Sequence, residues 1–372
     1  MRRRDFIGAI GGVPVAVAAV GSGATLAAQG AAVAGADAVT RAQMAAFDSP
    51  PFPEKGDAVK PAPRKGRIKQ AVTRGVFNAR PAGAPPAARG GGPQPGGMEF
   101  EEMCRQAARL GIKGFDLIAP ADWPMLKKYG LVSTMIYELG RGGGGGARGA
   151  APAAGAAGAP APPPAPAPPA PKVTDKAFHD HFVKIFSETI DVAAQNGFPN
   201  IILTTGSRGT TSDEENADGL VALLNSLKAR AEDKGVTLCT ELISSNQTQP
   251  LENRYQGDHA AWVFGVAKRV NSPRVKVLFD IFHSQIMDGN VVRNIRENFQ
   301  WIGHFHTGGN PPVSNNAGNR NELDHTQELY WPFVMKVIAD LGFTGYVAHE
   351  YQPAAGMDPI ASLEKCIRIC DA

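Results

Sequence analysis

The sequence predicts one α/β domain built as a (β/α)₈ barrel, and three observations carry that prediction. Short apolar or β-branched runs alternate with helical patterns through residues 66–372. There are eight such runs, and the helical patterns between them suit parallel strands with right-handed crossovers. When two Gly/Pro-rich tracts are set aside, roughly 260 residues remain, close to the length of a minimal barrel.

An open, doubly wound sheet is the alternative fold. No GxGxxG follows the first apolar run, and the sequence has no Walker loop. In chain order, the expected elements are strand 68–73, helix 99–110, strand 115–118, helix 123–129, strand 131–137, helix 177–196, strand 200–204, helix 213–234, strand 236–243, helix 259–270, strand 275–282, helix 291–298, strand 301–306, helix 330–341, strand 346–351 and helix 359–370.

Residues 1–30 have the pattern of an export signal. A basic start is followed by an apolar stretch over residues 7–20 and then by small residues. Within it, Arg3-Arg4-Asp5-Phe6-Ile7 fits the twin-arginine pattern, whose export machinery carries folded proteins. We therefore expect a periplasmic or secreted protein; the alternative is a frayed basic N-terminus ahead of an ordinary helix.

Three further tracts have the composition of linkers rather than of a core. Residues 31–65 are Ala/Pro-rich, and all of residues 140–171 are Gly, Ala or Pro except two arginines. A smaller Gly/Pro tract covers 81–97. Such segments bury too little apolar surface to offset their ordering entropy, so we expect 140–171 to be a disordered insertion in a single barrel domain, 66–372.

Composition narrows the class of protein. Arg2, Arg3, Arg4 and Asp5 together contribute +2 of the formal net charge of +3. The rest of the chain therefore lacks the excess of positive charge that is typical of nucleic-acid-binding proteins. No stretch after residue 30 is apolar for the roughly 18 residues of a membrane span. The four cysteines form no CxxC pair, and Cys366 and Cys370 are expected to be core thiols on one helix face. The sequence is compatible with a homo-oligomer.

Polar residues follow four consecutive apolar runs, at the barrel edge where active sites are built. These are Glu241 in the fifth run, Asp280 in the sixth, His304 and His306 in the seventh, and Glu350 in the eighth. Ionised carboxylates are rarely buried without a partner, so three of them converging with a histidine require a cation.

Glu241, Asp280, His306 and Glu350 therefore form a candidate site for a divalent metal. Hard oxygen ligands and one imidazole suit Mg²⁺ or Mn²⁺, and Co²⁺ or Zn²⁺ is also compatible. Taken singly, each acid also fits a helix cap or a salt bridge. His304 lies on the same strand face as His306 by its spacing of two, and we expect it to be a hydrogen-bonded residue inside the barrel.

From residue 68 onward the chain resembles bacterial hydroxypyruvate isomerase, one of the xylose isomerase-like TIM barrels. The matching segments are Arg109-Leu-Gly-Ile-Lys-Gly-Phe-Asp-Leu, Asp122-Trp-Pro-Met-Leu-Lys-Lys-Tyr-Gly-Leu, Gly206-Ser-Arg-Gly, Phe279-Asp-Ile-Phe-His-Ser-Gln, Gly303-His-Phe-His and Glu350-Tyr-Gln-Pro. The resemblance places Glu241, Asp280, His306 and Glu350 at the family's metal-ligand positions. It departs at His306, since the hydroxypyruvate branch can carry Gln there, whereas many sugar epimerases carry His.

The resemblance implies aldose–ketose isomerisation of hydroxypyruvate to 2-hydroxy-3-oxopropanoate, or the same shift on a related small hydroxy-carbonyl acid. The metal would stabilise an enediolate, with Glu241 and Glu350 as candidate acid and base. Arg320 would pair with a substrate carboxylate, and His283 would donate a hydrogen bond to a substrate oxygen. Arg208 and His179 match further substrate-binding positions. Each of these four also fits a purely structural role.

Several alternatives stay open from the sequence. Epimerisation or β-elimination on a keto-sugar needs the same metal and paired carboxylates, and it suits an exported protein. A DNA-repair endonuclease is disfavoured, because it needs more histidine ligands and a basic face. A non-catalytic secreted binding protein has no need for the ligand set. Export also conflicts with hydroxypyruvate, which is ordinarily a cytoplasmic metabolite.

Overall fold

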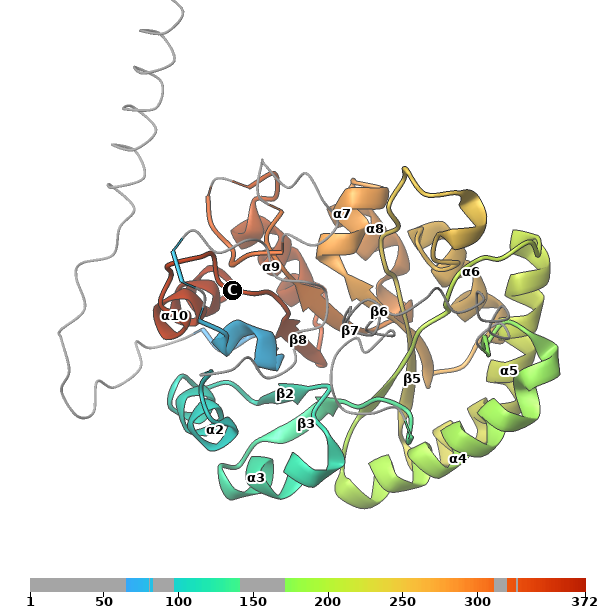
Figure 1. Ribbon diagram of the computed structural model, residues 1–372, viewed down its shortest axis with the longest axis horizontal. Helices are drawn as coiled ribbons and strands as arrows, with labels where there is room; N and C mark the ends of the chain where they lie inside the picture. The colour runs from blue at the N-terminus through green and yellow to red at the C-terminus, as the bar shows by residue number, and fades with distance from the viewer. Residues whose placement is uncertain (1–64, 80, 83–96, 141–170, 311–319, 326) are drawn as a thin grey trace, which may run out of the picture. The chain divides into compact units, whose positions relative to one another are not determined.

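The computed structural model describes residues 65–79, 81–82, 97–140, 171–310, 320–325 and 327–372 (Figure 1). The predicted export signal at 1–30 and residues 31–64 of the predicted linker lie outside these residues. So do residues 141–170 of the predicted insertion. These three assignments stay predictions.

Eight parallel strands form a nearly closed barrel, which confirms the predicted fold. Their order around the barrel is β3-β2-β1-β8-β7-β6-β5-β4. An isolated parallel bridge between Ile136 and Ile201 joins the β3 and β4 edges. The strands are β1 (Lys69–Val72), β2 (Gly114–Asp116), β3 (Val132–Met135), β4 (Asn200–Leu203), β5 (Thr237–Glu241), β6 (Val275–Asp280), β7 (Ile302–Thr307) and β8 (Tyr346–His349).

The helices form an outer ring around the strands (Figure 1). They are α2 (Phe100–Arg109), α3 (Trp123–Lys128), α4 (His179–Asn196), α5 (Asp213–Lys234), α6 (Ala260–Val270), α7 (Ile281–Met287), α8 (Val291–Asn298), α9 (Trp331–Asp340) and α10 (Pro359–Ile369). Among the described residues, none of these helices combines the length and apolarity of a membrane span.

Local signals explain where the longest helix begins and ends. The Ser212 side chain accepts a hydrogen bond from the backbone N–H of Glu215, and the Glu215 side chain accepts one from the backbone N–H of Ser212. At the other end, Gly235 adopts φ = 69°, a left-handed conformation that glycine reaches at little cost. These two caps fix α5 at the bounds that the sequence predicts, Asp213–Lys234.

The main core lies between the strands and the helices. Phe279 on β6 and Phe305 on β7 point outward and meet edge to face, with ring centroids 6.1 Å apart. Phe264 on α6 stacks on Phe279 at 5.8 Å. The smallest of three buried apolar clusters consists of Met135, Ile202, Cys239 and Leu278. Alternation along the strands thus directs every second side chain of β6 and β7 away from the helices, toward the barrel interior.

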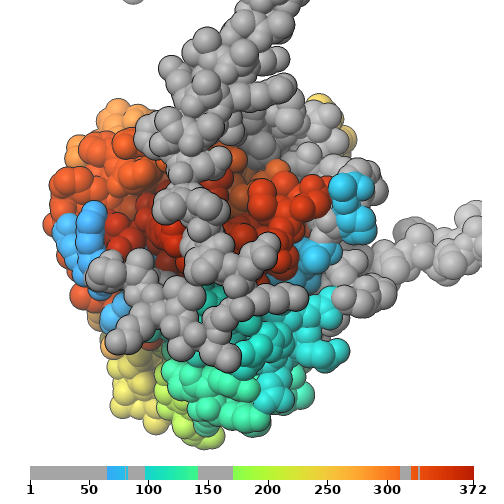
Figure 2. All heavy atoms as spheres, turned by 90° about the vertical axis from the view of Figure 1, so that its left-hand side faces the viewer, coloured from blue at the N-terminus to red at the C-terminus, as the bar shows by residue number. Residues whose placement is uncertain are grey.

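Two ends of the chain's described part meet at the β1–β8 seam. Lys69 through Val72 pair in parallel with Tyr346 through His349. Figure 2 shows residues of the 65–79 segment (blue) beside the C-terminal elements (red). The eighth strand therefore pairs with the first, which brings residues almost 280 positions apart in sequence into one sheet.

Seven of the eight expected strands run one or two residues beyond the carboxyl ends that the structure shows. The predicted strand 275–282 ends at Asp280, and α7 begins at Ile281 without a connecting loop. The apolar run continues through Phe282, so hydrophobicity alone does not mark the change from strand to helix. The Asp280 side chain causes it by accepting hydrogen bonds from the backbone N–H groups of Phe282 and His283.

Two helix glycines differ in the space around them, which generates a prediction about stability. A Cβ at Gly219 in α5 would lie 1.9 Å from the backbone oxygen of Thr174, whereas a Cβ at Gly265 in α6 would meet nothing within 4 Å. We expect Gly219→Ala to destabilise the protein by about 2 kcal/mol or more and to lower Tm by roughly 4–8 °C. The matched substitution Gly265→Ala should leave stability unchanged or raise it by up to about 1 kcal/mol. Thermal unfolding of both variants checks this, and equal Tm values would contradict it.

Candidate active site

Four polar side chains meet at the carboxyl ends of β5 to β8. Glu241 is the last residue of β5, Asp280 the last of β6, His306 lies on β7, and Glu350 directly follows β8. One ligand atom from each lies within 4.8 Å of the others, and the first three residues are buried. The four residues that the sequence selects as candidate metal ligands therefore lie together; we call them the ligand cluster.

A bulge in β7 aligns His306 with Asp280. Pairing between β6 and β7 shifts after Val277, so Leu278 lies opposite His304 and Asp280 opposite His306. The extra residue is Gly303, where a Cβ would lie 2.8 Å from Lys276 Cβ and 2.9 Å from Cys239 Sγ. Only glycine fits this crowded position, and the bulge turns both histidines into the barrel.

Backbone bonds position the two carboxylates that flank His306. Asp280 Oδ1 accepts from the N–H of Phe282 at 2.9 Å, which fixes the carboxylate and leaves Oδ2 directed at the cluster. The backbone N–H of Glu350 donates to the carbonyl oxygen of Thr307 at 2.9 Å. The side chain of Glu350 is 32% exposed, and that of Asp280 is fully buried. Glu350 is therefore the more solvent-accessible of the two carboxylates.

The ligand cluster fits a divalent cation. Among the described residues, Asp280 Oδ2, Glu350 Oε2 and His306 Nδ1 are buried and complete no hydrogen bond of acceptable geometry. His306 Nδ1 lies 2.7 Å from Glu350 Oε2 and 3.7 Å from both Glu241 Oε1 and Asp280 Oδ2. Buried polar atoms that complete no hydrogen bond are costly, and three of them around one point match the donor set of Mg²⁺ or Mn²⁺.

Arg320, a predicted substrate-binding residue, reaches the ligand cluster. Its Nη1 lies 2.7 Å from Asp280 Oδ2 and 3.2 Å from Glu350 Oε2. The guanidinium also lies over the Phe282 ring, with 4.8 Å from Cζ to the centroid. A positive charge thus borders the cluster on one side, where an anionic group of a substrate would find a bidentate partner.

Charge separates the pKa values of the two glutamates. Burial and the nearby charge of Glu350 raise the pKa of Glu241 to about 8. Burial also works against an ionised Glu350, but the charges of Arg320 and His306 outweigh it and lower the pKa of Glu350 to about 2. At neutral pH without a metal, Glu350 is therefore ionised and Glu241 mostly protonated.

The pKa values of Asp280 and His306 are both shifted in the direction that favours the charged form. Burial opposes charge on both Asp280 and His306. The charge of Arg320 nevertheless holds the pKa of Asp280 below its usual range. The charge of Glu350, with the hydrogen bond to Asp116, raises the pKa of His306 well above its usual value. The cluster without a metal is thus stabilised by a protonated imidazole and a guanidinium.

Asp116 also belongs to this site, and sequence reasoning did not select it. It ends β2, and its Oδ2 lies 2.9 Å from His306 Nε2 and 2.7 Å from His304 Nε2. His304 is fully buried, as expected for a residue inside the barrel. A carboxylate at a strand end is the same signal that selects Asp280, but the expected strand 115–118 puts Asp116 in its interior, whereas β2 ends at Asp116 after only three residues.

His283, another predicted substrate-binding residue, borders the ligand cluster from α7. Its Nε2 lies 3.6 Å from Asp280 Oδ2, and its Nδ1 forms a 2.9 Å hydrogen bond with Ser244 Oγ. The residue is buried, with 8% of its surface exposed. Its position beside the cluster is compatible with the predicted contact to a substrate oxygen.

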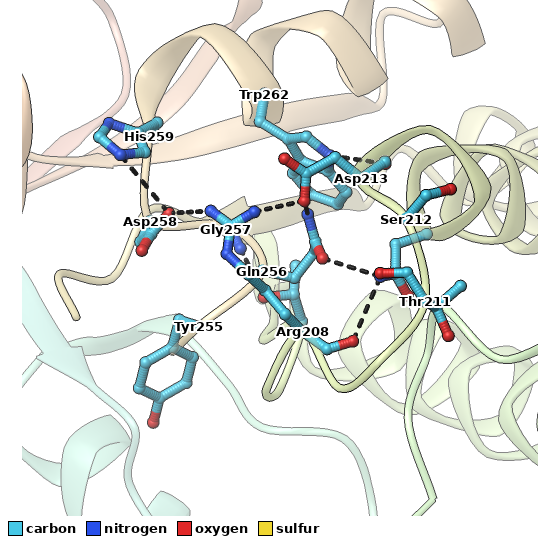
Figure 3. A network of polar contacts seen from close by, with 12 residues as sticks. Arg208, Thr211, Ser212, Asp213, Tyr255, Gln256, Gly257, Asp258, His259 and Trp262 are labelled. Carbon is cyan, nitrogen blue, oxygen red and sulfur yellow. Dashed lines mark hydrogen bonds and ion pairs between the residues drawn. The ribbon is translucent and has the colours of Figure 1, made fainter. Parts of the chain in front are cut away.

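Arg208 lies in a separate polar network (Figure 3). Its guanidinium lies between two carboxylates, with 2.7 Å to Asp258 and a close contact to Asp213. Asp213 also accepts from Gln256 at 3.0 Å, so the network ties the loop after β4 to the loop before α6. Within the described part of the chain, the ion pairs of Arg208 are with these two aspartates and not with the ligand cluster, which gives it the contacts of a loop clamp.

His179 begins α4. Its Nε2 is buried and has no hydrogen-bond partner among the described residues. Burial lowers its pKa below the usual value for histidine. The structure gives His179 no contact that joins it to the ligand cluster within the described ranges, so its predicted substrate role stays a prediction.

Comparison with known proteins agrees with the fold. A family model described as xylose isomerase-like TIM barrel matches residues 104–368. The chain belongs to this family. The match covers most of the barrel, from α2 to α10, and includes all four residues of the ligand cluster. Members of the xylose isomerase-like family commonly bind divalent metals, which agrees with the donor set found here.

Curated relatives match over part of the chain. A putative hydroxypyruvate isomerase of Xenopus laevis is 33% identical over 138 residues, 37% of this chain and 46% of that protein. A 2-oxo-tetronate isomerase of Cupriavidus necator is 32% identical over 123 residues, 33% of this chain and 43% of that protein. A D-psicose 3-epimerase of Agrobacterium fabrum is 28% identical over 127 residues, 34% of this chain and 39% of that protein. Each match spans less than half of the relative.

The shifted pKa values generate a prediction about metal affinity. A cation must displace protons from Glu241 and His306, both of which have raised pKa values. The apparent Kd for Mn²⁺ should therefore fall by about tenfold or more per unit of rising pH between pH 6 and 8. Calorimetric titration at several pH values measures this. An affinity independent of pH between 6 and 8 would contradict the assignment.

Proposed function

We propose that this protein is a metal-dependent aldose–ketose isomerase acting on a small hydroxy-carbonyl acid. The observation that carries the proposal is the pair Glu241 and Glu350, two members of a donor set for a divalent cation at the carboxyl ends of the barrel strands. The substrate that we infer is hydroxypyruvate, converted to 2-hydroxy-3-oxopropanoate. The names of two relatives, a putative hydroxypyruvate isomerase and a 2-oxo-tetronate isomerase, support an acid of this class.

The cluster divides the chemistry between cation and side chains. Glu241, Asp280, His306 and Glu350 would hold Mg²⁺ or Mn²⁺, and the bound ion would stabilise negative charge that develops on adjacent substrate oxygens. The two glutamates supply proton transfer. A carboxylate takes the proton from the hydroxyl-bearing carbon and, now protonated, returns it to the neighbouring carbon, while the hydroxyl proton passes to the former carbonyl oxygen.

Different surroundings give the two glutamates separate pKa values in the cluster without a metal. Glu350 is ionised well below neutral pH because Arg320 and His306 lie beside it, whereas burial raises the pKa of Glu241 to about 8. Pairs of carboxylates with separated pKa values are typical of acid–base catalysis. Either glutamate can begin as the base, depending on which isomer is bound.

Arg320 and His283 would orient the substrate. The guanidinium of Arg320 already contacts two carboxylates of the cluster, at 2.7 and 3.2 Å. A substrate carboxylate can take the place of these contacts once a cation neutralises Asp280 and Glu350. His283, held by Ser244 at 2.9 Å, lies beside Asp280 and can donate a hydrogen bond to a substrate oxygen.

A sugar epimerase or keto-sugar lyase is the second candidate function. His306 favours it, because many sugar epimerases carry His at the third ligand position, where the hydroxypyruvate branch can carry Gln. The relative named D-psicose 3-epimerase supports it further. Epimerisation uses the same cation and the same two glutamates, so the two candidates differ in substrate and not in site.

We also propose that residues 1–30 direct export by the twin-arginine route. The basic start, the apolar stretch and Arg3-Arg4-Asp5-Phe6-Ile7 support this. Export would place the enzyme in the periplasm or outside the cell, where a sugar-derived acid or a keto-sugar is a more accessible substrate than hydroxypyruvate made in the cytoplasm.

Proton NMR in D₂O tests the reaction. With hydroxypyruvate and Mg²⁺, we expect isomerisation with deuterium entering the product carbon, and we expect EDTA to abolish it. A panel of keto-sugars run in parallel separates the two candidates. Turnover of a keto-sugar without turnover of hydroxypyruvate would keep the site and establish the epimerase or lyase function. No turnover of any member of either class would contradict the proposal.

Substitution of one glutamate tests the acid–base pair. Glu350→Gln removes a charge that both holds the cation and moves a proton, so kcat should fall about 10³-fold. The matched control is Glu188→Gln on α4, which removes a glutamate whose ion pair with Lys184 is exposed. The control should keep wild-type kcat, and a Glu350→Gln variant with more than a tenth of wild-type kcat would refute the assignment.

A further inference from the structure

The buried carboxylate of Asp116 contacts the predicted metal ligand His306 from the side opposite the cluster. Asp116 Oδ2 lies 2.9 Å from His306 Nε2, and both side chains are fully buried. The other ring nitrogen, Nδ1, lies between 2.7 and 3.7 Å from the carboxylates of Glu350, Glu241 and Asp280. His306 is thus held between two groups of carboxylates that contact different nitrogens.

We propose that Asp116 is a positioning residue that selects the tautomer of His306 for metal binding. An ionised carboxylate only accepts hydrogen bonds. Nε2 of His306 must therefore carry a proton and donate the hydrogen bond to Asp116. In the neutral imidazole, Nδ1 then has a free lone pair directed at the ligand cluster. This inference rests on the proposed metal site and adds Asp116, which is not among the site residues predicted from the sequence.

Asp116 is itself fixed on three sides. Thr134 on β3 donates a hydrogen bond to Oδ1, and His304 Nε2 lies 2.7 Å from Oδ2. The carboxylate therefore cannot turn away from His306 without leaving Thr134 or His304 unpaired in the barrel interior, which is costly. His304 helps to hold Asp116 in place, because its Nε2 contacts the same Oδ2 atom that contacts His306.

The backbone around Asp116 is unusual in a way that suits this role. Pairing between β2 and β3 shifts between Phe115 and Asp116, and the next residue, Leu117, has φ = 62°. A left-handed conformation is rare for a bulky residue and persists only where the surroundings enforce it. Here the Leu117 N–H donates to the carbonyl oxygen of Met135 at 2.8 Å, which holds the turn that directs Asp116 inward.

The distances favour hydrogen bonds over a second cation site. Asp116, His304 and His306 also form a group of potential ligands. However, one oxygen of Asp116 lies at ordinary hydrogen-bond distance from both Nε2 atoms, and Thr134 occupies the other oxygen. The proposal accordingly predicts one bound cation per chain.

Mn²⁺ titration of the full chain by calorimetry tests the proposal. Asp116→Asn should bind Mn²⁺ 10- to 100-fold more weakly than the wild type, as expected when the partner of a ligating histidine is removed. The matched control is Asp288→Asn, which removes a carboxylate 2.6 Å from Nδ1 of His259, a histidine outside the cluster. The control should bind Mn²⁺ within twofold of the wild type. Unfolding curves in EDTA separate loss of affinity from loss of fold.

Two further measurements keep the proposal testable if Asp116→Asn does not fold. Thr134→Val preserves side-chain shape but releases Oδ1 of Asp116, and it should weaken Mn²⁺ binding severalfold. In wild-type protein with ¹⁵N-labelled histidine and bound Mg²⁺, NMR should show His306 protonated on Nε2 and unprotonated on Nδ1. A purely structural role for Asp116 would not fix this tautomer.

The outcomes separate this inference from the proposed function. Wild-type protein that binds no Mn²⁺ would overturn both. Wild-type protein that binds one ion, together with an Asp116→Asn variant of equal affinity or a His306 protonated on Nδ1, would overturn only the role of Asp116. Two ions per wild-type chain would assign Asp116 as a ligand instead.

Discussion

Repulsion among three carboxylates is the constraint on which this site depends. Glu241, Asp280 and Glu350 present oxygens within 4.8 Å of one another around a buried histidine. Charges this close cannot all persist in a barrel interior unless positive charge compensates them. The protein meets the requirement in part with Arg320 and with protons on Glu241 and His306, as the direction of each pKa shift indicates. A divalent cation meets it more fully, and we regard the cluster as built for one.

The barrel architecture brings these charged side chains together. Eight parallel strands bring their carboxyl ends to one edge, so residues more than a hundred positions apart converge without a long loop. Small local features then set the geometry. The bulge at Gly303 brings His306 opposite Asp280, the cap at the start of α7 fixes one oxygen of Asp280, and the turn at Leu117 directs Asp116 inward. The helices and the outward-facing aromatic core hold these features in place.

Most of the fold and the four residues of the ligand cluster could be predicted from the sequence, but Asp116 could not. The eight apolar runs marked the strands, and strand-end polarity selected Glu241, Asp280, His306 and Glu350, because those strands are long enough to show a pattern. Asp116 escaped because the expected strand 115–118 puts it in the strand interior, whereas β2 ends at Asp116 after only three residues. The start of α7 escaped because a side-chain cap, rather than a change in hydrophobicity, ends β6. Arg208 illustrates another limit, since its pairing with Asp258, fifty residues away, is a tertiary contact that no local pattern shows.

The central claim is that the ligand cluster binds a divalent cation, and anomalous diffraction from crystals grown with Mn²⁺ tests it most directly. The account predicts one strong anomalous peak about 2 Å from Oε1 of Glu241, Oδ2 of Asp280, Nδ1 of His306 and Oε2 of Glu350. Manganese bound elsewhere, with Arg320 still in contact with Asp280 and Glu350 in the same crystals, would contradict it.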